Sequence, residues 1–218
     1  MNYFEKKRKE MVEKLKKNGY LKDERIEKAM LKVKRELFVL EEYAESAYED
    51  TPLPIPGNAT ISAPHMHSIY LHALELKKGD KVLEVGFGSG ILLAYIKEVI
   101  GEGKIFGIEI NKETFEFGKK NLKRAGYRGI KLFLGDGSKG LEKEAPFDKI
   151  LISAACPEIP KPLIEQLNEN GILVAPVGGV SGGQDLIKIK KLEGGKIIKK
   201  NLGPVIFLPL VGEYGFKI

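Results

Sequence analysis

The sequence predicts an α/β protein with a doubly wound, mostly parallel sheet, an antiparallel hairpin at the C-terminal edge and a helical cap at the N-terminus. Three observations predict it. From residue 81 onward, short apolar runs alternate with helix-length segments, as in parallel sheets. Three glycines at alternate positions, Gly86, Gly88 and Gly90, follow the first apolar run. Residues 185–202 alternate apolar and charged side chains around a Gly-Gly turn, which is typical of a hairpin.

The N-terminal residues are predicted to form two helices followed by a proline-rich segment. Apolar residues at helical spacing predict a first helix over residues 4–15, and Asn18-Gly19 ends it. Asp23 can cap a second helix, which the pattern extends to Phe38. Three prolines in residues 51–57 exclude a helix interior and indicate an ordered extended loop or an edge strand.

The remainder predicts alternating strands and helices, then the hairpin. Strands are expected at residues 81–85, 104–108, 130–134, 147–153 and 172–177, and helices at 91–100, 114–125 and 162–168. The hairpin pairs residues 185–192 with 196–202, and residues 207–210 are expected to finish it. We therefore expect one domain, residues 1–218, made of a cap and proline-rich loop (1–57), a cofactor-binding core (58–180) and a hairpin region (181–218).

Composition narrows the class of protein. The 218 residues carry a formal charge of +6, but basic and acidic residues are interspersed along the predicted helices, a pattern typical of solvated faces rather than of a nucleic-acid footprint. No apolar stretch is long enough to span a membrane. A single cysteine, Cys156, excludes an internal disulfide and a cysteine-based metal cluster. We expect a cytoplasmic protein, monomeric by preference, without nucleic-acid or membrane partners.

The glycine turn indicates the cofactor. Dinucleotide sites use Gly-x-Gly-x-x-Gly, whose turn suits a pyrophosphate. Here the third glycine comes one residue early, Ile91 takes the position that the dinucleotide pattern gives to glycine, and Glu84 leads into the turn. A carboxylate repels a pyrophosphate but attracts the cationic amino group and sulfonium of S-adenosylmethionine. Glu109 lies about 20 residues past the glycines, where such folds place a ribose-binding carboxylate. The pattern favours S-adenosylmethionine over NAD.

Several further segments resemble one family over nearly the whole chain, the protein-L-isoaspartate (D-aspartate) O-methyltransferases. The most specific block is Thr60-Ile61-Ser62-Ala63-Pro64-His65-Met66, which generic S-adenosylmethionine enzymes lack. The other matching segments include Arg35-Glu36-Leu37-Phe38-Val39, Gly135-Asp136-Gly137, Ala154-Ala155-Cys156-Pro157 and Phe207-Leu208-Pro209-Leu210. The chain departs from many members at Ala59, Ile91 and Cys156, none of them a catalytic type.

The resemblance implies methyl transfer from S-adenosylmethionine to the α-carboxyl of L-isoaspartyl residues in damaged proteins and peptides, with S-adenosylhomocysteine as product. The ester would close to a succinimide, whose hydrolysis returns some normal aspartyl linkage and so initiates repair. The family's active-site serine corresponds to Ser62. A carboxylate is already ionised at neutral pH, so no general base is needed. We therefore expect Ser62 to orient the substrate carboxylate by donating a hydrogen bond, without forming a covalent intermediate.

Position in the predicted fold assigns the cofactor contacts. Glu84 is expected beside the methionine amino group and Glu109 on the ribose hydroxyls. Asp136, or backbone next to it, is expected to meet the adenine amino group. The remaining expected cofactor-binding residues are Thr60, Gly86, Gly88, Ser89, Gly90 and Gly137.

The histidines of Pro64-His65-Met66-His67 raise the question of a metal. Alternate positions on a strand can present two imidazoles to one ion, but no nearby Cys or further His completes the set, and His72 lies too far along. We expect no metal, with structural or substrate-facing roles for His65 and His67 and a packed thiol at Cys156.

Three other functions share parts of this pattern. A methyltransferase for another acceptor would keep the glycine turn and Glu109 but would not need the block around Ser62. A non-catalytic S-adenosylmethionine-binding module would keep every binding residue, so only an assay separates it. An NAD oxidoreductase is disfavoured by the glycine spacing.

Overall fold

The computed structural model describes residues 2–180 and 182–217. Boundary residues 1, 181 and 218 of the expected division lie outside the described residues. The helices are α1 (Tyr3–Lys17), α2 (Glu24–Lys32), α3 (Pro64–Ala73), α4 (Ile91–Ile100), α5 (Lys112–Arg124) and α6 (Lys161–Glu165). The strands are β1 (Leu53–Ile55), β2 (Ala59–Ile61), β3 (Lys81–Val85), β4 (Lys104–Glu109), β5 (Ile130–Leu134), β6 (Phe147–Ile152), β7 (Leu167–Gly179), β8 (Gly182–Lys191) and β9 (Ile197–Val205).

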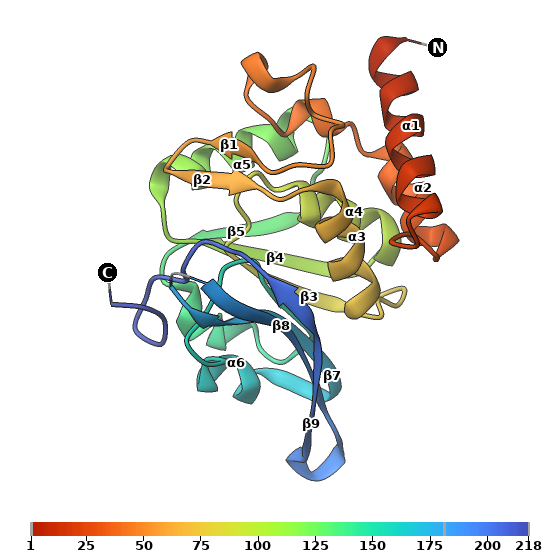
Figure 1. Ribbon diagram of the computed structural model, residues 1–218. Helices are drawn as coiled ribbons and strands as arrows, with labels where there is room; N and C mark the ends of the chain where they lie inside the picture. The colour runs from red at the N-terminus through yellow and green to blue at the C-terminus, as the bar shows by residue number, and fades with distance from the viewer. Residues whose placement is uncertain (1, 181, 218) are drawn as a thin grey trace.

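Seven strands form one twisted sheet in the order β5-β4-β3-β6-β7-β8-β9 (Figure 1). The strands β5, β4, β3, β6 and β7 are parallel to one another, and β8 and β9 add an antiparallel hairpin beside β7 at one edge. The predicted mostly parallel sheet with its C-terminal edge hairpin is confirmed. The strand order reverses around β3, and ligands of such sheets bind at the carboxyl ends of the strands near that point.

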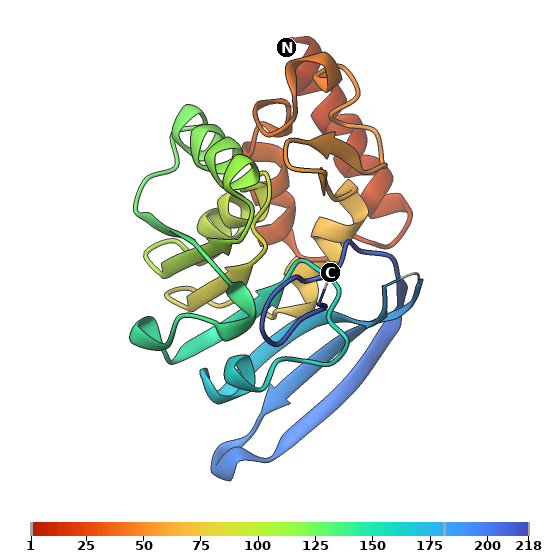
Figure 2. The same ribbon diagram turned by 90° about the vertical axis from the view of Figure 1, so that its left-hand side faces the viewer.

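Apolar residues of the central strands point alternately to two hydrophobic clusters. Val82 and Ile105 pack into the first, together with the N-terminal helices, α3, α4 and α5. Leu83 and Phe106 pack into the second, which includes Leu163 of α6. Figure 2 shows the sheet between these helical layers. Because both faces are covered, the central strands are nearly continuous apolar runs.

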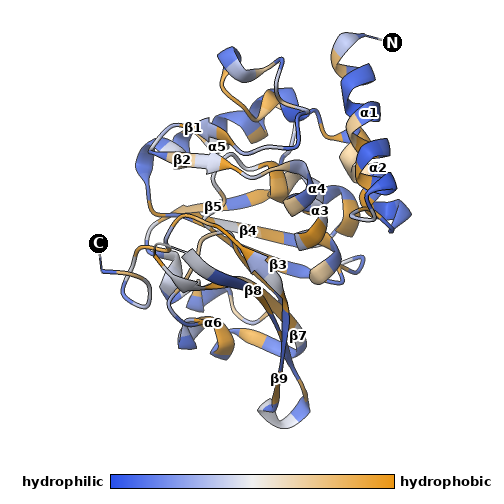
Figure 3. Ribbon diagram, viewed as in Figure 1, coloured by the Kyte–Doolittle hydropathy of each residue, from blue (hydrophilic) through white to orange (hydrophobic). Residues whose placement is uncertain are grey.

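The N-terminal helices belong to the same hydrophobic cluster as α4. Helix α1 buries Met11, Val12 and Leu15, and α2 buries Ile26 and Met30. Figure 3 shows hydrophilic residues over most of α1 and α2 with hydrophobic positions between them, as the periodicity predicts. None of the helices in residues 2–180 and 182–217 has the length and apolar character needed to cross a bilayer.

Helix α2 ends earlier than predicted. It begins at the predicted Asp23 cap, whose carboxylate accepts from the Arg25 backbone N–H at 2.8 Å. It stops at Lys32 rather than Phe38, because Val33 is extended (ψ 123°) and a 3-10 turn over Arg35–Leu37 follows. Arg35 in this turn and Phe38 directly after it are completely buried.

Two other predicted elements need correction. The helix expected over 162–168 is α6, which ends at Glu165, because Leu167 already pairs with Phe147 of β6 as the start of β7. Residues 207–210 do not finish the hairpin. They leave β9, and Leu210 N–H donates to the Ala155 carbonyl at 2.6 Å beyond the end of β6. This crossing brings the C-terminal segment to the carboxyl ends of the parallel strands.

Candidate active site

The predicted glycine turn joins β3 to α4. Gly86, Gly88 and Gly90 have φ values of 76°, 52° and 85°, all in the left-handed region that disfavours other residues. A Cβ at Gly90 would also lie 2.9 Å from Leu122 Cγ. The turn is fixed at its start, where Gly86 N–H donates to the Ile108 carbonyl at 2.8 Å. The backbone conformation therefore favours glycine at all three positions, and packing against Leu122 also requires it at Gly90.

Helix α5 braces this turn from outside. A Cβ at Gly118 would lie 2.3 Å from the Gly88 carbonyl oxygen, so the helix approaches the turn as closely as a glycine permits. Asn121 Nδ2 donates to the Ser89 carbonyl at 3.2 Å. The Ser89 side chain is buried and its Oγ accepts weakly from Ile91 N–H at 3.4 Å, at the start of α4. Ser89 thus shapes the turn whose backbone the cofactor would approach.

Glu84 is a buried carboxyl group with one oxygen free of protein partners. Its side chain is 1% exposed, and Oε1 accepts from Ser153 Oγ at 2.8 Å. Among the described residues, Oε2 has no hydrogen-bond partner. Burial raises the pKa of Glu84 to about 8, the Ser153 hydroxyl partly opposes this, and the charge of Glu109 adds to it. A cationic amino group is the kind of ligand group that satisfies such an oxygen, whereas a pyrophosphate would be repelled.

Glu109 stands at the end of β4 and is tied to the glycine turn. Its Oε2 accepts from Gly88 N–H at 3.2 Å, and Oε1 accepts from the backbone N–H groups of Ile110 and Asn111 at 2.9 and 3.0 Å. The structure therefore brings the two parts of the predicted cofactor motif together. A carboxylate accepts about four hydrogen bonds, so one position remains that a ribose hydroxyl would fill.

Asp136 occupies the carboxyl end of β5 but faces the C-terminal segment. Its Oδ1 accepts from the backbone N–H and the hydroxyl of Ser138, and Oδ2 accepts from Glu213 N–H at 2.8 Å. Burial would raise the pKa of Asp136, but these hydrogen bonds outweigh it and the pKa is lowered. Because the carboxylate is engaged in this way, the neighbouring backbone is the group left for an adenine. Gly137 allows close packing, since a Cβ there would lie 2.5 Å from Val85 Cγ1.

The segment that carries Ser62 is packed over the cofactor turn. Strands β1 and β2 form a small antiparallel hairpin, and Ile55 Cδ1 lies 3.6 Å from where a Cβ of Gly88 would be. The loop of the hairpin is attached to the start of α5, where Thr114 Oγ1 donates to the Pro56 carbonyl at 2.8 Å. Ser62 follows β2 directly and is half-buried. The hairpin that leads to Ser62 therefore packs on the predicted cofactor turn.

Thr60 does not share this position. It lies on β2 opposite Pro54 with its side chain exposed, and the described contacts include no hydrogen bond from it to the glycine turn. Its expected role in cofactor binding stays a prediction.

The two histidines lie on the first turns of α3, not on a strand. His65 Nδ1 lies 2.9 Å from Asp50 Oδ1, whereas the buried His67 Nδ1 lies 3.1 Å from an Arg35 nitrogen. Burial, and next the charge of Arg35, hold the pKa of His67 well below its usual value. Positions two apart on a helix do not face the same way. Within the described ranges, no three His, Cys, Asp or Glu side chains converge as metal ligands.

No local sequence pattern predicted a role for two residues of the site, Ser153 and Arg35. Ser153, the hydroxyl partner of Glu84, follows β6, and its contact spans 69 positions of the chain. Arg35 contacts the Ser62 carbonyl at 2.8 Å from 27 positions away. The motif around Arg35 matched the family, but no local pattern gave the residue a role.

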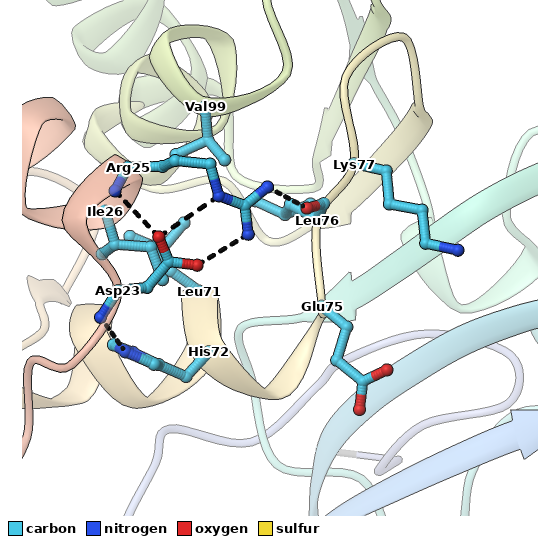
Figure 4. Close-up of a pocket in the computed structure, with 9 residues that line it drawn as sticks. All are labelled: Asp23, Arg25, Ile26, Leu71, His72, Glu75, Leu76, Lys77 and Val99. Carbon is cyan, nitrogen blue, oxygen red and sulfur yellow. Dashed lines mark hydrogen bonds and ion pairs between the residues drawn. The ribbon is translucent and has the colours of Figure 1, made fainter.

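A concave pocket at the other end of the sheet is separate from this site. Figure 4 shows Asp23, Arg25 and His72 in its wall, with Glu75 and Lys77 from the loop that leads into the beginning of β3. The Arg25 guanidinium is already engaged by the Asp23 carboxylate and the Leu76 carbonyl. The glycine turn follows the opposite end of β3, so we do not assign this pocket to the cofactor.

The fold and the carboxyl-end site define a Rossmann-like S-adenosylmethionine-dependent methyltransferase. This assignment to a class of enzyme rests on the glycine turn, the buried acceptor at Glu84 and the fixed carboxylate of Glu109.

The particular family follows from comparison with known proteins. The family model for protein-L-isoaspartate (D-aspartate) O-methyltransferase matches residues 6–215. The chain is 48% identical to a protein-L-isoaspartate O-methyltransferase of Pyrococcus horikoshii over 96% of this chain and 94% of that protein. It is 49% identical to protein-L-isoaspartate O-methyltransferase 2 of Archaeoglobus fulgidus over 98% and 97%. The chain belongs to the protein-L-isoaspartate (D-aspartate) O-methyltransferase family.

A solved structure agrees over the whole fold. The protein-L-isoaspartate O-methyltransferase of Plasmodium falciparum, in complex with S-adenosyl-L-homocysteine, superimposes with a TM-score of 0.84 at 30% identity. The match covers 97% of this chain and 99% of that one. The shared fold therefore includes the N-terminal helices and the C-terminal hairpin as well as the cofactor-binding core.

Proposed function

We propose that this protein transfers a methyl group from S-adenosylmethionine to the α-carboxyl of L-isoaspartyl residues in damaged proteins and peptides. Membership in the family supports the reaction. One structural observation supports this location of the reaction in the fold: the hairpin that leads to Ser62 packs on the glycine turn through Ile55. This contact supports a substrate segment held close to the cofactor segment.

The residues at the carboxyl ends of β3, β4 and β5 fit the cofactor. Glu84 Oε2 would accept from its amino group, Glu109 from a ribose hydroxyl, and backbone beside Asp136 and Gly137 would contact adenine. The glycine turn with Ser89 allows close backbone approach. When bound, S-adenosylmethionine supplies an electrophilic methyl group on its sulfonium.

The protein's task toward the acceptor is orientation. An α-carboxyl group is ionised at neutral pH, so it is already a nucleophile and no side chain has to remove a proton. Ser62 would donate a hydrogen bond to one carboxylate oxygen and leave the other free to react. Holding reactants in position can contribute about 7 kcal/mol or more to lowering a barrier, and exclusion of water by the hairpin adds to it.

The consequence for the substrate is repair. The methoxy group of a methyl ester leaves far more readily than the oxygen of a carboxylate, so the neighbouring backbone nitrogen can attack the ester carbonyl and close a succinimide with loss of methanol. Hydrolysis of that ring returns in part the normal aspartyl linkage. The protein needs only to make the ester, because ring closure is spontaneous.

Charge and cysteine placement support polypeptide acceptors in a reducing compartment. Several exposed lysines of α1 pair with glutamates of the same helix, as in Lys9–Glu5 at 3.3 Å, rather than forming a basic stripe. Cys156 is buried. We therefore propose a monomeric cytoplasmic enzyme of one domain, acting on proteins and peptides and not on nucleic acid or membranes.

The test is methyl transfer from labelled S-adenosylmethionine to a synthetic peptide that contains L-isoaspartate, beside the same peptide with normal aspartate. We expect base-labile label on the isoaspartyl peptide alone. Label on neither peptide, with cofactor binding intact by calorimetry, would assign the protein to another acceptor or to the non-catalytic class.

A further inference from the structure

Ser62 lies in a short link between β2 and α3, and its position depends on what holds that link. The following residue, Ala63, is buried, and its carbonyl accepts from the N–H groups of Met66 and His67 as α3 begins. The carbonyl of Ser62 itself belongs to neither β2 nor α3. It accepts from a guanidinium nitrogen of Arg35 at 2.8 Å.

Arg35 joins three segments through the fork of its side chain. Besides the Ser62 carbonyl, Nε donates to the Ala47 carbonyl at 2.5 Å, and a second terminal nitrogen lies 3.1 Å from His67 Nδ1. The side chain is completely buried. A planar guanidinium with diverging donors fixes the relative positions of its acceptors in a way that a single ammonium cannot.

Stability alone does not account for this arrangement. No carboxylate makes a hydrogen bond or ion pair with Arg35 in the part of the chain that the structure describes, so the buried cation is held by neutral acceptors. Burial without a directly paired carboxylate is costly even though the charge of Asp50 offsets part of the cost, and an apolar side chain would fill the space at lower cost. The pKa of Arg35 is lowered by this burial, yet a guanidinium stays charged at neutral pH. A need for fixed geometry at the site explains why a buried arginine occupies this position.

His67 completes the arrangement because it accepts at Nδ1. A protonated imidazole could not accept from the guanidinium. Burial, followed by the charge of Arg35, lowers the pKa of His67 well below its usual value, so the ring stays neutral. The contact is therefore maintained throughout the neutral range.

We propose that Arg35 is a positioning residue that holds the main chain of Ser62, and with it the Ser62 hydroxyl, in the orientation needed for the substrate carboxylate. This rests on the proposed function for the role of Ser62. Arg35 acts through Ser62, so its loss should reduce turnover of the peptide and leave cofactor affinity unchanged.

A neighbouring network supplies the matched control. Arg8 is a second buried arginine, whose Nε donates to Tyr48 Oη at 2.8 Å and whose terminal nitrogen pairs with Glu36 at 3.3 Å. It stabilises the same N-terminal region but makes no described contact with Ser62. Arg8→Lys therefore reproduces the loss of a buried fork without releasing the serine.

The experiment compares Arg35→Lys with Arg8→Lys. We expect Arg35→Lys to lower kcat for the isoaspartyl peptide by about 10- to 100-fold, while the dissociation constant of S-adenosylhomocysteine changes less than about twofold. Arg8→Lys should lower the melting temperature to a similar degree and leave both constants within about twofold. Hydrogen exchange by mass spectrometry should show faster exchange of residues 62–67 in Arg35→Lys only.

A second pair covers the case in which Arg35→Lys does not fold. His67→Asn keeps an acceptor near the position of Nδ1, whereas His67→Leu removes it. His67→Asn should recover most of the kcat that His67→Leu loses.

Equal losses of kcat in Arg35→Lys and Arg8→Lys, or equal activities of the two His67 variants, would overturn the proposal. If the wild type leaves the isoaspartyl peptide unmethylated, the proposed function fails. Hydrogen exchange then decides the positioning claim by itself, because unchanged protection of residues 62–67 in Arg35→Lys would refute it.

Discussion

Cofactor binding should release a proton from Glu84, and Glu84→Gln should abolish that release. The carboxyl group is buried and its pKa is raised to about 8, so the free protein holds it mostly neutral below that pH. An ammonium at Oε2 favours the charged form. Binding must therefore remove the proton, and affinity should rise with pH toward the pKa of Glu84 as long as the ligand's amino group stays cationic.

The magnitude follows from the shift. One pH unit below the pKa, ionising Glu84 costs about 1.4 kcal/mol, which is about tenfold in affinity per pH unit. An α-amino group titrates near about 8, so between about pH 6 and pH 7 the cofactor stays cationic and the slope reports the carboxyl group. Glu84→Gln should lose the slope and, near pH 8, about 1.5 to 3 kcal/mol of a charge-assisted hydrogen bond.

Isothermal titration calorimetry with S-adenosylhomocysteine measures both quantities. Repeating the titration near pH 6.5 in buffers of different ionisation enthalpy counts the protons released, and we expect about one for the wild type and none for Glu84→Gln. A wild-type affinity that does not change between about pH 6 and pH 7, or the same proton release from Glu84→Gln, would refute the reasoning.

Three further outcomes follow from the site. Ser62→Ala should lower kcat/KM for the isoaspartyl peptide by about 10- to 100-fold, because it removes a hydrogen bond to a charged group. Cofactor affinity, measured by calorimetry, should not change. Unaltered turnover would show that Ser62 is not part of the site. Gly118→Ala should lower the free energy of unfolding by about 1 to 3 kcal/mol and weaken cofactor binding, because its Cβ would lie 2.3 Å from the Gly88 carbonyl. Replacement of the exposed neighbour, Lys119→Ala, is the control. Equal melting temperatures of the two variants would contradict this. Burial raises the pKa of Cys156 to about 12, so a thiol-disulfide reagent should label it near pH 8 only after unfolding, and rapid labelling of the native protein would show an accessible thiolate.

The sequence predicted the parts of the site that are local in the chain. Glu84 and the three glycines lie within one strand and its turn, and Glu109 ends the next strand, so spacing and residue type were sufficient. Parallel pairing of β3 with β4 then brings these groups together at one edge of the sheet.

The parts that were missed depend on distant segments. Helical periodicity continues past Lys32, but α2 ends there, and the buried Arg35 of the turn that follows contacts His67 of α3 and the Ser62 carbonyl. The pairing of Leu167 with Phe147 shortens α6, and pairing with Ala155 draws residues 207–210 away from the hairpin. None of these contacts has a signature within a local window, because each is decided by tertiary packing.

The central claim is tested most directly by a competition in one reaction, with an isoaspartyl peptide and its normal aspartyl isomer at equal concentration, followed by tandem mass spectrometry. The account predicts a transient methyl ester on the α-carboxyl of the isoaspartyl residue, then a succinimide, then growth of the aspartyl isomer. An ester on the normal aspartyl peptide at a similar rate, or on any other carboxyl group of the isoaspartyl peptide, would contradict it.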